Sequence, residues 1–179
     1  MKLIAIVGMC GSGKSVASDY LESKDWNKIY FGGVTMNELK KANMEINPEN
    51  EKYMREKLRK EHGMAAFAIL LLDTIKESLK TKNTVLDGLY SWDELVVLKK
   101  EFGDNLKVVS IITDKDIRYS RLTTREIRPL TNEEAKKRDI AEIENLAKGG
   151  PISYADYYIL NNDSREKYIE RLEEIINNI

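Results

Sequence analysis

The sequence predicts an α/β protein with a mainly parallel sheet, and two observations carry this prediction. Apolar or β-branched runs recur along the chain with helical patterns between them, and a glycine-rich turn, Gly8 to Gly13, joins the first run to a helical pattern. Strands that alternate with helices imply right-handed crossovers and parallel neighbours. The five runs are Leu3–Val7, Lys28–Phe31, Thr84–Leu86, Val108–Thr113 and Tyr157–Leu160.

The helical patterns can be placed in order between these strands. The first spans about Lys14 to Ser23, and a second begins near Thr35. A third starts after Pro48, because proline suits the first turn of a helix. Residues Met64 to Leu79 are apolar almost all round, which predicts a helix that is buried along much of its length.

Two capping boxes mark later helix starts. The segments Ser91-Trp92-Asp93-Glu94 and Thr131-Asn132-Glu133-Glu134 have the S/T-x-x-E form, so helices should start just after Ser91 and Thr131. The last helix follows Asp163-Ser164 and carries apolar residues at amphipathic spacing. The polar segment at about 114–148 is rich in Lys and Arg and is interpreted as an excursion above the sheet.

Composition excludes several classes of protein. The 179 residues suit one domain over 1–179, and no repeat or linker divides them. With 29 basic against 30 acidic residues, no global field draws the chain to nucleic acid or to an anionic membrane. The single cysteine, Cys10, fits a reducing compartment, and no apolar run is long enough to span a bilayer. We expect a cytoplasmic monomer or weak homo-oligomer.

The motif Gly8-x-x-x-x-Gly13-Lys14-Ser15 is the phosphate-binding loop pattern, and it lies in the strand-loop-helix context that this pattern requires. Glycines let the backbone turn tightly, so that successive N–H groups form an anion nest at a helix N-terminus. Lys14 would reach the β- and γ-phosphates, and the Ser15 hydroxyl would join the Mg²⁺ shell. A glycine-rich turn that matches by accident is the alternative.

The strand Thr84–Leu86 ends in Asp87-Gly88. Taken alone, Asp before Gly is a common turn former. In a parallel sheet, however, the carboxyl ends of the strands face the ligand crevice, so Asp87 would lie near the Mg²⁺ and the phosphates. Asp87 is therefore the candidate for holding the metal through its water shell.

Spacings of three and four place Arg118, Arg121 and Arg125 on one helical face, which extends to Arg128 if the helix continues. A solvated basic face is the usual interpretation of such a series. Because phosphoryl transfer needs cations over the migrating charge, we favour Arg121 and Arg125 as phosphate clamps in a mobile lid. Asn161-Asn162 is either a plain turn or a contact for adenine.

Six segments of the chain stand out together. They are GMCGSGKS at 8–15, LRKEHGMAAFA at 58–68, VLDGLYSWDEL at 85–95, RLTTR at 121–125, LTNEEAKKRD at 130–139 and ADYYILNN at 155–162. With these segments the chain resembles the small P-loop kinases of the nucleoside monophosphate kinase type, and within them dephospho-CoA kinase and a related archaeal group. The resemblance implies a three-layer P-loop NTPase fold with a five-stranded parallel sheet and a helical, arginine-rich lid, and ATP and Mg²⁺ as the donor system.

Motif and resemblance together assign roles to individual residues. We expect Lys14, Asp87, Arg121 and Arg125 to act in catalysis, and Ser15 and Asp87 to position the metal. The expected nucleotide-binding residues are Gly8, Gly11, Ser12, Gly13, Lys14, Ser15, Val16, Arg121 and Asn162.

The acceptor side departs from the kinases that the chain resembles. Those kinases commonly carry Gly-Asp after the second strand and an Arg a few residues on, whereas Gly33 and Met36 stand here. In the archaeal group an Arg tends to occupy the position of Tyr90. Losing a carboxylate and two cations should weaken the binding of a phosphorylated acceptor, at about 1.5–3 kcal/mol for each charged hydrogen bond.

The sequence therefore predicts an ATP-dependent small-molecule kinase of the dephospho-CoA kinase-like type, acting on a nucleotide-like acceptor. Two alternatives stay open. A nucleoside or deoxynucleoside monophosphate kinase would share every donor residue, and a regulator that binds ATP without transferring phosphate would fit the altered acceptor side.

Overall fold

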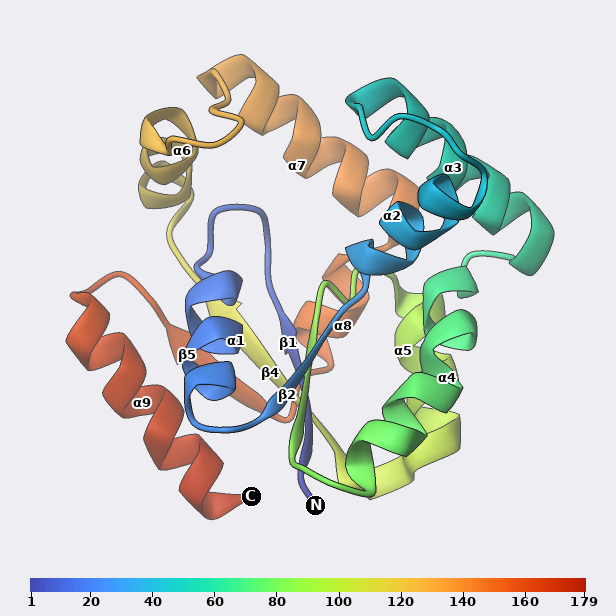
Figure 1. Cartoon of the computed structure of the whole chain (residues 1–179). Coiled ribbons are helices and arrows are strands. Elements are labelled where there is room, and N and C mark those ends of the chain that lie inside the picture. Colours follow the sequence, from blue (N-terminus) through green and yellow to red (C-terminus); the bar gives the residue numbers. More distant parts are fainter.

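The computed structural model describes all residues from 1 to 179. It has a five-stranded parallel sheet in the order β2-β3-β1-β4-β5, which confirms the predicted α/β class (Figure 1). The central strand β1 is fully buried, as its unbroken apolar run requires. The strands are β1 (Leu3–Val7), β2 (Asn27–Tyr30), β3 (Thr84–Asp87), β4 (Leu106–Ile112) and β5 (Tyr157–Leu160).

The helices alternate with these strands along the chain. A short 3-10 turn, η1 (Gly103–Asn105), precedes β4. The helices are α1 (Lys14–Ser23), α2 (Gly32–Lys41), α3 (Pro48–His62), α4 (Ala66–Leu79), α5 (Trp92–Phe102), α6 (Lys115–Thr124), α7 (Asn132–Leu146), α8 (Gly149–Ser153) and α9 (Arg165–Asn178).

Helices cover both faces of the sheet, so the protein has three layers. Because side chains alternate along a strand, β1 sends Ile4 and Ile6 to one face and Leu3, Ala5 and Val7 to the other. The first face packs against α1 and α9. The second packs against α2, α3, α4 and α5 in the larger of the two cores.

The carboxyl ends of the strands all lie at one edge of the sheet. The β1–α1 loop lies at this edge, and Figure 1 shows α2, α3, α6 and α7 gathered beyond it, with both chain termini at the opposite end. Every strand pairing is parallel, so β1, β3 and β4 all point their carboxyl ends to this edge. Residues that follow these strands are thereby brought together.

Three local features differ from the sequence prediction. Helix α6 ends at Thr124, so Arg125 and Arg128 do not continue it. The Thr123 and Thr124 hydroxyls donate to the carbonyl of Ser120, which competes with the helical bonds of this turn. The short helices η1 and α8 lack any sequence pattern, since α8 opens on two glycines and a proline. None of the helices is long and apolar enough to cross a membrane.

Candidate active site

The loop between β1 and α1 requires glycine at three positions. Gly8, Gly11 and Gly13 have φ values of 146°, 81° and 99°. Packing excludes a side chain as well, because a Cβ at Gly8 would lie 2.6 Å from the carbonyl oxygen of Ile111, and one at Gly13 would lie 2.4 Å from Nδ2 of Asn161. The backbone of the loop is thus fixed in one shape.

This loop presents backbone donors at the N-terminus of α1. The N–H of Ser12 donates to the carbonyl of Met9, whereas the N–H groups of Gly11, Gly13 and Lys14 have no acceptor in the protein. Unpaired donors that meet the positive end of a helix dipole suit a phosphate group. The loop therefore fits the triphosphate of a nucleotide.

Lys14 brings a cation to the same loop. Its Nζ donates to the Met9 carbonyl at 3.0 Å. Burial, together with the charge of Lys148, lowers the pKa of Lys14 to about 8. An anion beside this ammonium would restore its charge, so ligand binding and protonation of Lys14 are linked.

Side chains from the second half of the chain hold the loop in place. Thr113, after β4, donates to the Ser12 carbonyl at 3.1 Å, and Asn161 Nδ2 donates to the same oxygen at 2.8 Å. The Tyr168 hydroxyl, on α9, donates to the Gly13 carbonyl at 3.0 Å. Among these three residues, only Asn161 has a signal in the sequence, through the segment ADYYILNN. Thr113 and Tyr168 have no local signal, because their role depends on the sheet order.

Asp87 lies where its strand predicts, at the carboxyl end of β3. It is 7% exposed, and its Oδ2 accepts a hydrogen bond of 2.8 Å from Ser18 on α1. Lys28 Nζ lies 3.9 Å from the same carboxylate. The hydroxyl-bearing Ser15, in the first turn of α1, is exposed.

These oxygens fit Mg²⁺ as it binds beside a nucleotide. The chain has no cluster of three or more His, Cys, Asp or Glu side chains that would form a complete metal cage. Magnesium in phosphoryl-transfer sites needs only one or two protein oxygens, with phosphates and water completing its shell. Ser15 and Asp87 are the residues that would hold the ion.

The arginine series does not form a solvated face, which is the usual interpretation of its spacing. Arg118 is buried, and its two terminal nitrogens lie 3.0 and 2.7 Å from the carboxylate oxygens of Asp139 on α7. Arg118 also donates to the Cys10 carbonyl at 2.9 Å. Through these hydrogen bonds, Arg118 on α6 connects α7 to the phosphate loop, which is a structural role.

Arg121 and Arg125 occupy different environments. Arg121 donates to the Asn161 carbonyl at 3.1 Å, and its buried Nη1 has no partner. Arg125 lies past the end of α6 in extended backbone, and its Nε donates to the carbonyl of Arg128. Arg128, at φ 51°, pairs with Glu51 on α3. The expectation of one shared helical face is therefore wrong beyond Arg121.

The two remaining residues predicted to bind the nucleotide are Val16 and Asn162. Val16 is in the first turn of α1 and donates its N–H to the Gly13 carbonyl at 3.1 Å. Asn162 accepts a hydrogen bond of 3.0 Å from the backbone of Asp114. Its neighbour Asn161 makes the direct contact with the loop.

The acceptor side is open around Gly33 and crowded around Tyr90. A Cβ added at Gly33 would have no heavy atom within 4 Å. Tyr90 is half-buried, and burial raises the pKa of its hydroxyl. The ammonium of Lys148 lies 4.5 Å from the centre of the Tyr90 ring. On α3, the buried Nε of Arg59 has no hydrogen-bond partner. Sequence reasoning missed both of these cations.

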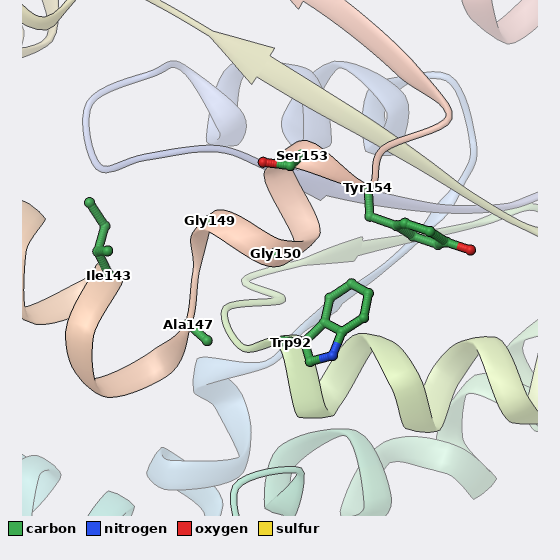
Figure 2. A pocket seen from close by; sticks show the side chains of 7 residues that line it. All are labelled: Trp92, Ile143, Ala147, Gly149, Gly150, Ser153 and Tyr154. Atoms are coloured by element: carbon green, nitrogen blue, oxygen red, sulfur yellow. The ribbon is translucent and has the colours of Figure 1, made fainter.

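An apolar groove lies apart from these residues. Trp92 and Tyr154 lie beside each other there (Figure 2). Their rings meet edge to face, with centres 5.5 Å apart. The groove has a volume of about 460 Å³, and α7, α8 and the start of α5 line it. None of the predicted site residues borders it, so it is not part of the candidate site.

Comparison with known proteins agrees with this arrangement. The AAA domain family matches residues 4–146. A UPF0200 protein of Thermococcus onnurineus is 32% identical over 99% of this chain and 97% of its own length. The chain belongs to this AAA domain family and to the UPF0200 group. A second UPF0200 protein, from Pyrococcus abyssi, is 34% identical over 99% of the chain and 96% of its own length.

Solved structures share the fold at low sequence identity. Shikimate kinase from Bacteroides thetaiotaomicron superimposes with a TM-score of 0.60 at 18% identity, covering 98% of both chains. Dephospho-CoA kinase from Campylobacter jejuni gives 0.56 at 17% identity, over 99% of this chain and 96% of its own. These likenesses support the P-loop kinase-like fold that the sequence predicts.

Proposed function

We propose that this protein is an ATP-dependent phosphotransferase that moves the γ-phosphoryl group to a small, nucleotide-like acceptor, in the manner of dephospho-CoA kinase. The observation that carries the proposal is the loop of three positive-φ glycines, whose free N–H groups and Lys14 lie together at the start of α1. Such a cradle binds the β- and γ-phosphates in kinases of this fold.

The remaining residues have roles that follow from their positions. Ser15 and Asp87 would hold Mg²⁺, which would neutralise charge on the phosphates. Arg121, whose Nη1 has no partner in the protein, would contact the migrating phosphoryl group, and Arg125 would join it when the segment 114–148 closes as a lid. Because no carboxylate stands at Gly33, Asp87 also orients the acceptor hydroxyl.

The test is phosphoryl transfer from labelled ATP and Mg²⁺ to a panel of acceptors. Dephospho-CoA, nucleoside monophosphates and shikimate represent the acceptor types, and transfer to dephospho-CoA is the expected result. Transfer to a mononucleotide alone would replace the acceptor assignment. Tight ATP binding with no transfer to any acceptor would mean a nucleotide-binding regulator instead.

The donor site has its own test. Replacing Lys14 with Ala removes a charged contact, so we expect ATP affinity to fall about tenfold to a hundredfold, from about 1.5–3 kcal/mol for a charged hydrogen bond. Fluorescent ATP titration measures this, with the exposed Lys136→Ala variant as control. Unchanged affinity in Lys14→Ala would overturn the donor-site assignment.

A further inference from the structure

Lys148 is a buried cation in the turn between α7 and α8, outside the residues assigned above. The residue is 1% exposed. Its Nζ lies 2.5 Å from Oε2 of Glu142 and 4.5 Å from the centre of the Tyr90 ring. The ammonium is therefore held between a carboxylate on α7 and an aromatic face in the loop that follows Asp87.

Glu142 does not serve Lys148 alone. Its other oxygen accepts a hydrogen bond of 3.0 Å from Nε of Arg138, one turn earlier on α7. Burial raises the pKa of Glu142, but the charges of Lys148 and Arg138 outweigh this and hold the pKa below its usual value. One ionised carboxylate thus faces two cations, and the cluster keeps an excess positive charge.

The excess charge lies beside the phosphate loop. Helix α7 is joined to this loop next to Arg138, because Nη1 of Arg118 donates to Asp139 at 3.0 Å and to the Cys10 carbonyl at 2.9 Å. The charge of Lys148 also lowers the pKa of Lys14, second only to burial. Glu142 and Asp87 offset part of this repulsion between the two ammonium groups, and a bound anion would offset more of it. A lysine that served only the fold would not need a second ammonium group nearby. A buried ion pair contributes little to stability compared with apolar packing.

We propose that Lys148 forms a second phosphate-binding subsite, on the acceptor side of Lys14 and against the ring of Tyr90. This inference rests on the proposed function and extends it to the acceptor. The ligand is a phosphate group, either the γ-phosphoryl group of ATP or a phosphate carried by the acceptor. Lys148 turns from Glu142 to that group, and Arg138 remains to balance Glu142.

Tyr90 has a defined part in this subsite. It occupies the position at which the archaeal group tends to have an arginine, and the cation here comes instead from the α7–α8 turn. The flat ring supports the ammonium from one side, as aromatic faces do for cations. An arginine introduced at position 90 would carry its charge into the same space.

The test measures binding of two probes by calorimetry. Orthophosphate is titrated into protein loaded with Mg²⁺ and ADP, and AMP into protein loaded with Mg²⁺ and a non-hydrolysable ATP analogue. Lys148→Met should weaken binding at least tenfold in one of these arms while ADP affinity stays within twofold. An effect on orthophosphate assigns the subsite to the γ-phosphoryl group, and an effect on AMP assigns it to the acceptor phosphate.

A matched control and a rescue separate binding from structure. Lys99→Met removes another paired lysine and should change neither arm. Lys99 lies on α5 and donates to the Leu106 carbonyl on β4 and to Asp156 just before β5. Adding Tyr90→Arg to Lys148→Met should recover most of the lost affinity, which a merely structural role of Lys148 would not allow. If Lys148→Met fails to fold, Lys148→Met with Glu142→Gln removes both charges and should show the same loss.

The outcomes distinguish the two proposals. If the wild type transfers phosphate but the Lys148 variants bind both probes normally, the subsite is wrong and the kinase assignment stands. If the wild type binds Mg²⁺ and ADP but neither probe, the subsite is also wrong. If the wild type binds neither ADP nor ATP, both proposals fall.

Discussion

At the scale of single residues, the buried charge of Lys14 lowers the stability of the ligand-free protein. The protein places this ammonium where burial and Lys148 disfavour its charged form. The pKa of Lys14 is lowered from 10.5 to about 8, so the unfolded chain binds more protons than the folded protein between these two pH values. Stability from this group therefore increases as pH rises from about 8 to 10.5.

Replacing Lys14 with Met should stabilise the ligand-free protein. The variant lacks the buried charge, so its urea midpoint should exceed that of the wild type at pH 7, and the gap should narrow as pH approaches 10. Lys136→Met, at an exposed position, should show neither effect. A Lys14→Met variant that is less stable than the wild type at pH 7 would contradict this reasoning.

The same residue gives nucleotide binding a pH dependence. A phosphate beside Lys14 favours its charged form, so binding takes up protons when the free ammonium is partly neutral. We expect ATP affinity to fall as pH rises above about 8, with proton uptake visible as a buffer-dependent binding enthalpy. Lys148→Met removes the second cause of the lowered pKa, so it should move this fall to higher pH.

At the scale of elements, capping boxes position two helices that flank the site. Ser91 accepts a hydrogen bond of 3.1 Å from the N–H of Glu94, and the Glu94 side chain accepts from the N–H groups of Tyr90 and Ser91. Both Ser91 and Glu94 are buried. The box therefore fixes the start of α5 and also the backbone at Tyr90.

Replacing Ser91 with Ala should destabilise the protein by about 1–2 kcal/mol, at the upper end of the range for N-caps, because the cap is buried. Ser164 caps α9 at an exposed position, so Ser164→Ala should cost about 0.5–1 kcal/mol. Urea unfolding measures both values. Equal costs would show that burial of the cap has no influence.

Helices whose signals are local could be predicted from the sequence. Prediction placed the starts of α5 and α7 correctly, because a capping box needs only four neighbouring residues. The end of α6 was missed, since competition by threonine hydroxyls is not visible in residue spacing. Helix α8 was missed because tertiary packing determines it: a Cβ at Gly150 would lie 2.8 Å from the Trp92 ring.

At the scale of the whole molecule, the phosphate loop and its supports come from opposite ends of the chain. The loop motif and Asp87 could be predicted, because strand ends in a parallel sheet point to one edge. The supports could not, since Tyr168 and Thr113 reach the loop only through the strand order β1-β4-β5. The cations Lys148 and Arg59 were also missed, because their positions against Tyr90 and Phe67 depend on tertiary packing.

Removing the hydroxyl of Tyr168 should therefore weaken ATP binding, although Tyr168 is not one of the residues expected to contact the nucleotide. Tyr168→Phe deletes the hydrogen bond to the Gly13 carbonyl, so we expect a loss of about 1 kcal/mol in stability. ATP affinity should fall severalfold, because the loop is less well fixed. Tyr157→Phe, at a half-buried position on β5, is the matched control and should leave ATP affinity unchanged.

The anchoring of the loop by Asn161 and Tyr168 has a consequence for synthesis on the ribosome. Residues 8–15 are synthesised before the side chains that hold them, because Asn161 follows β5 and Tyr168 lies on α9. A nascent chain that has not yet reached α9 lacks the Tyr168 hydrogen bond, so its loop is held less firmly. We therefore expect the loop to take its final shape only after α9 has been synthesised.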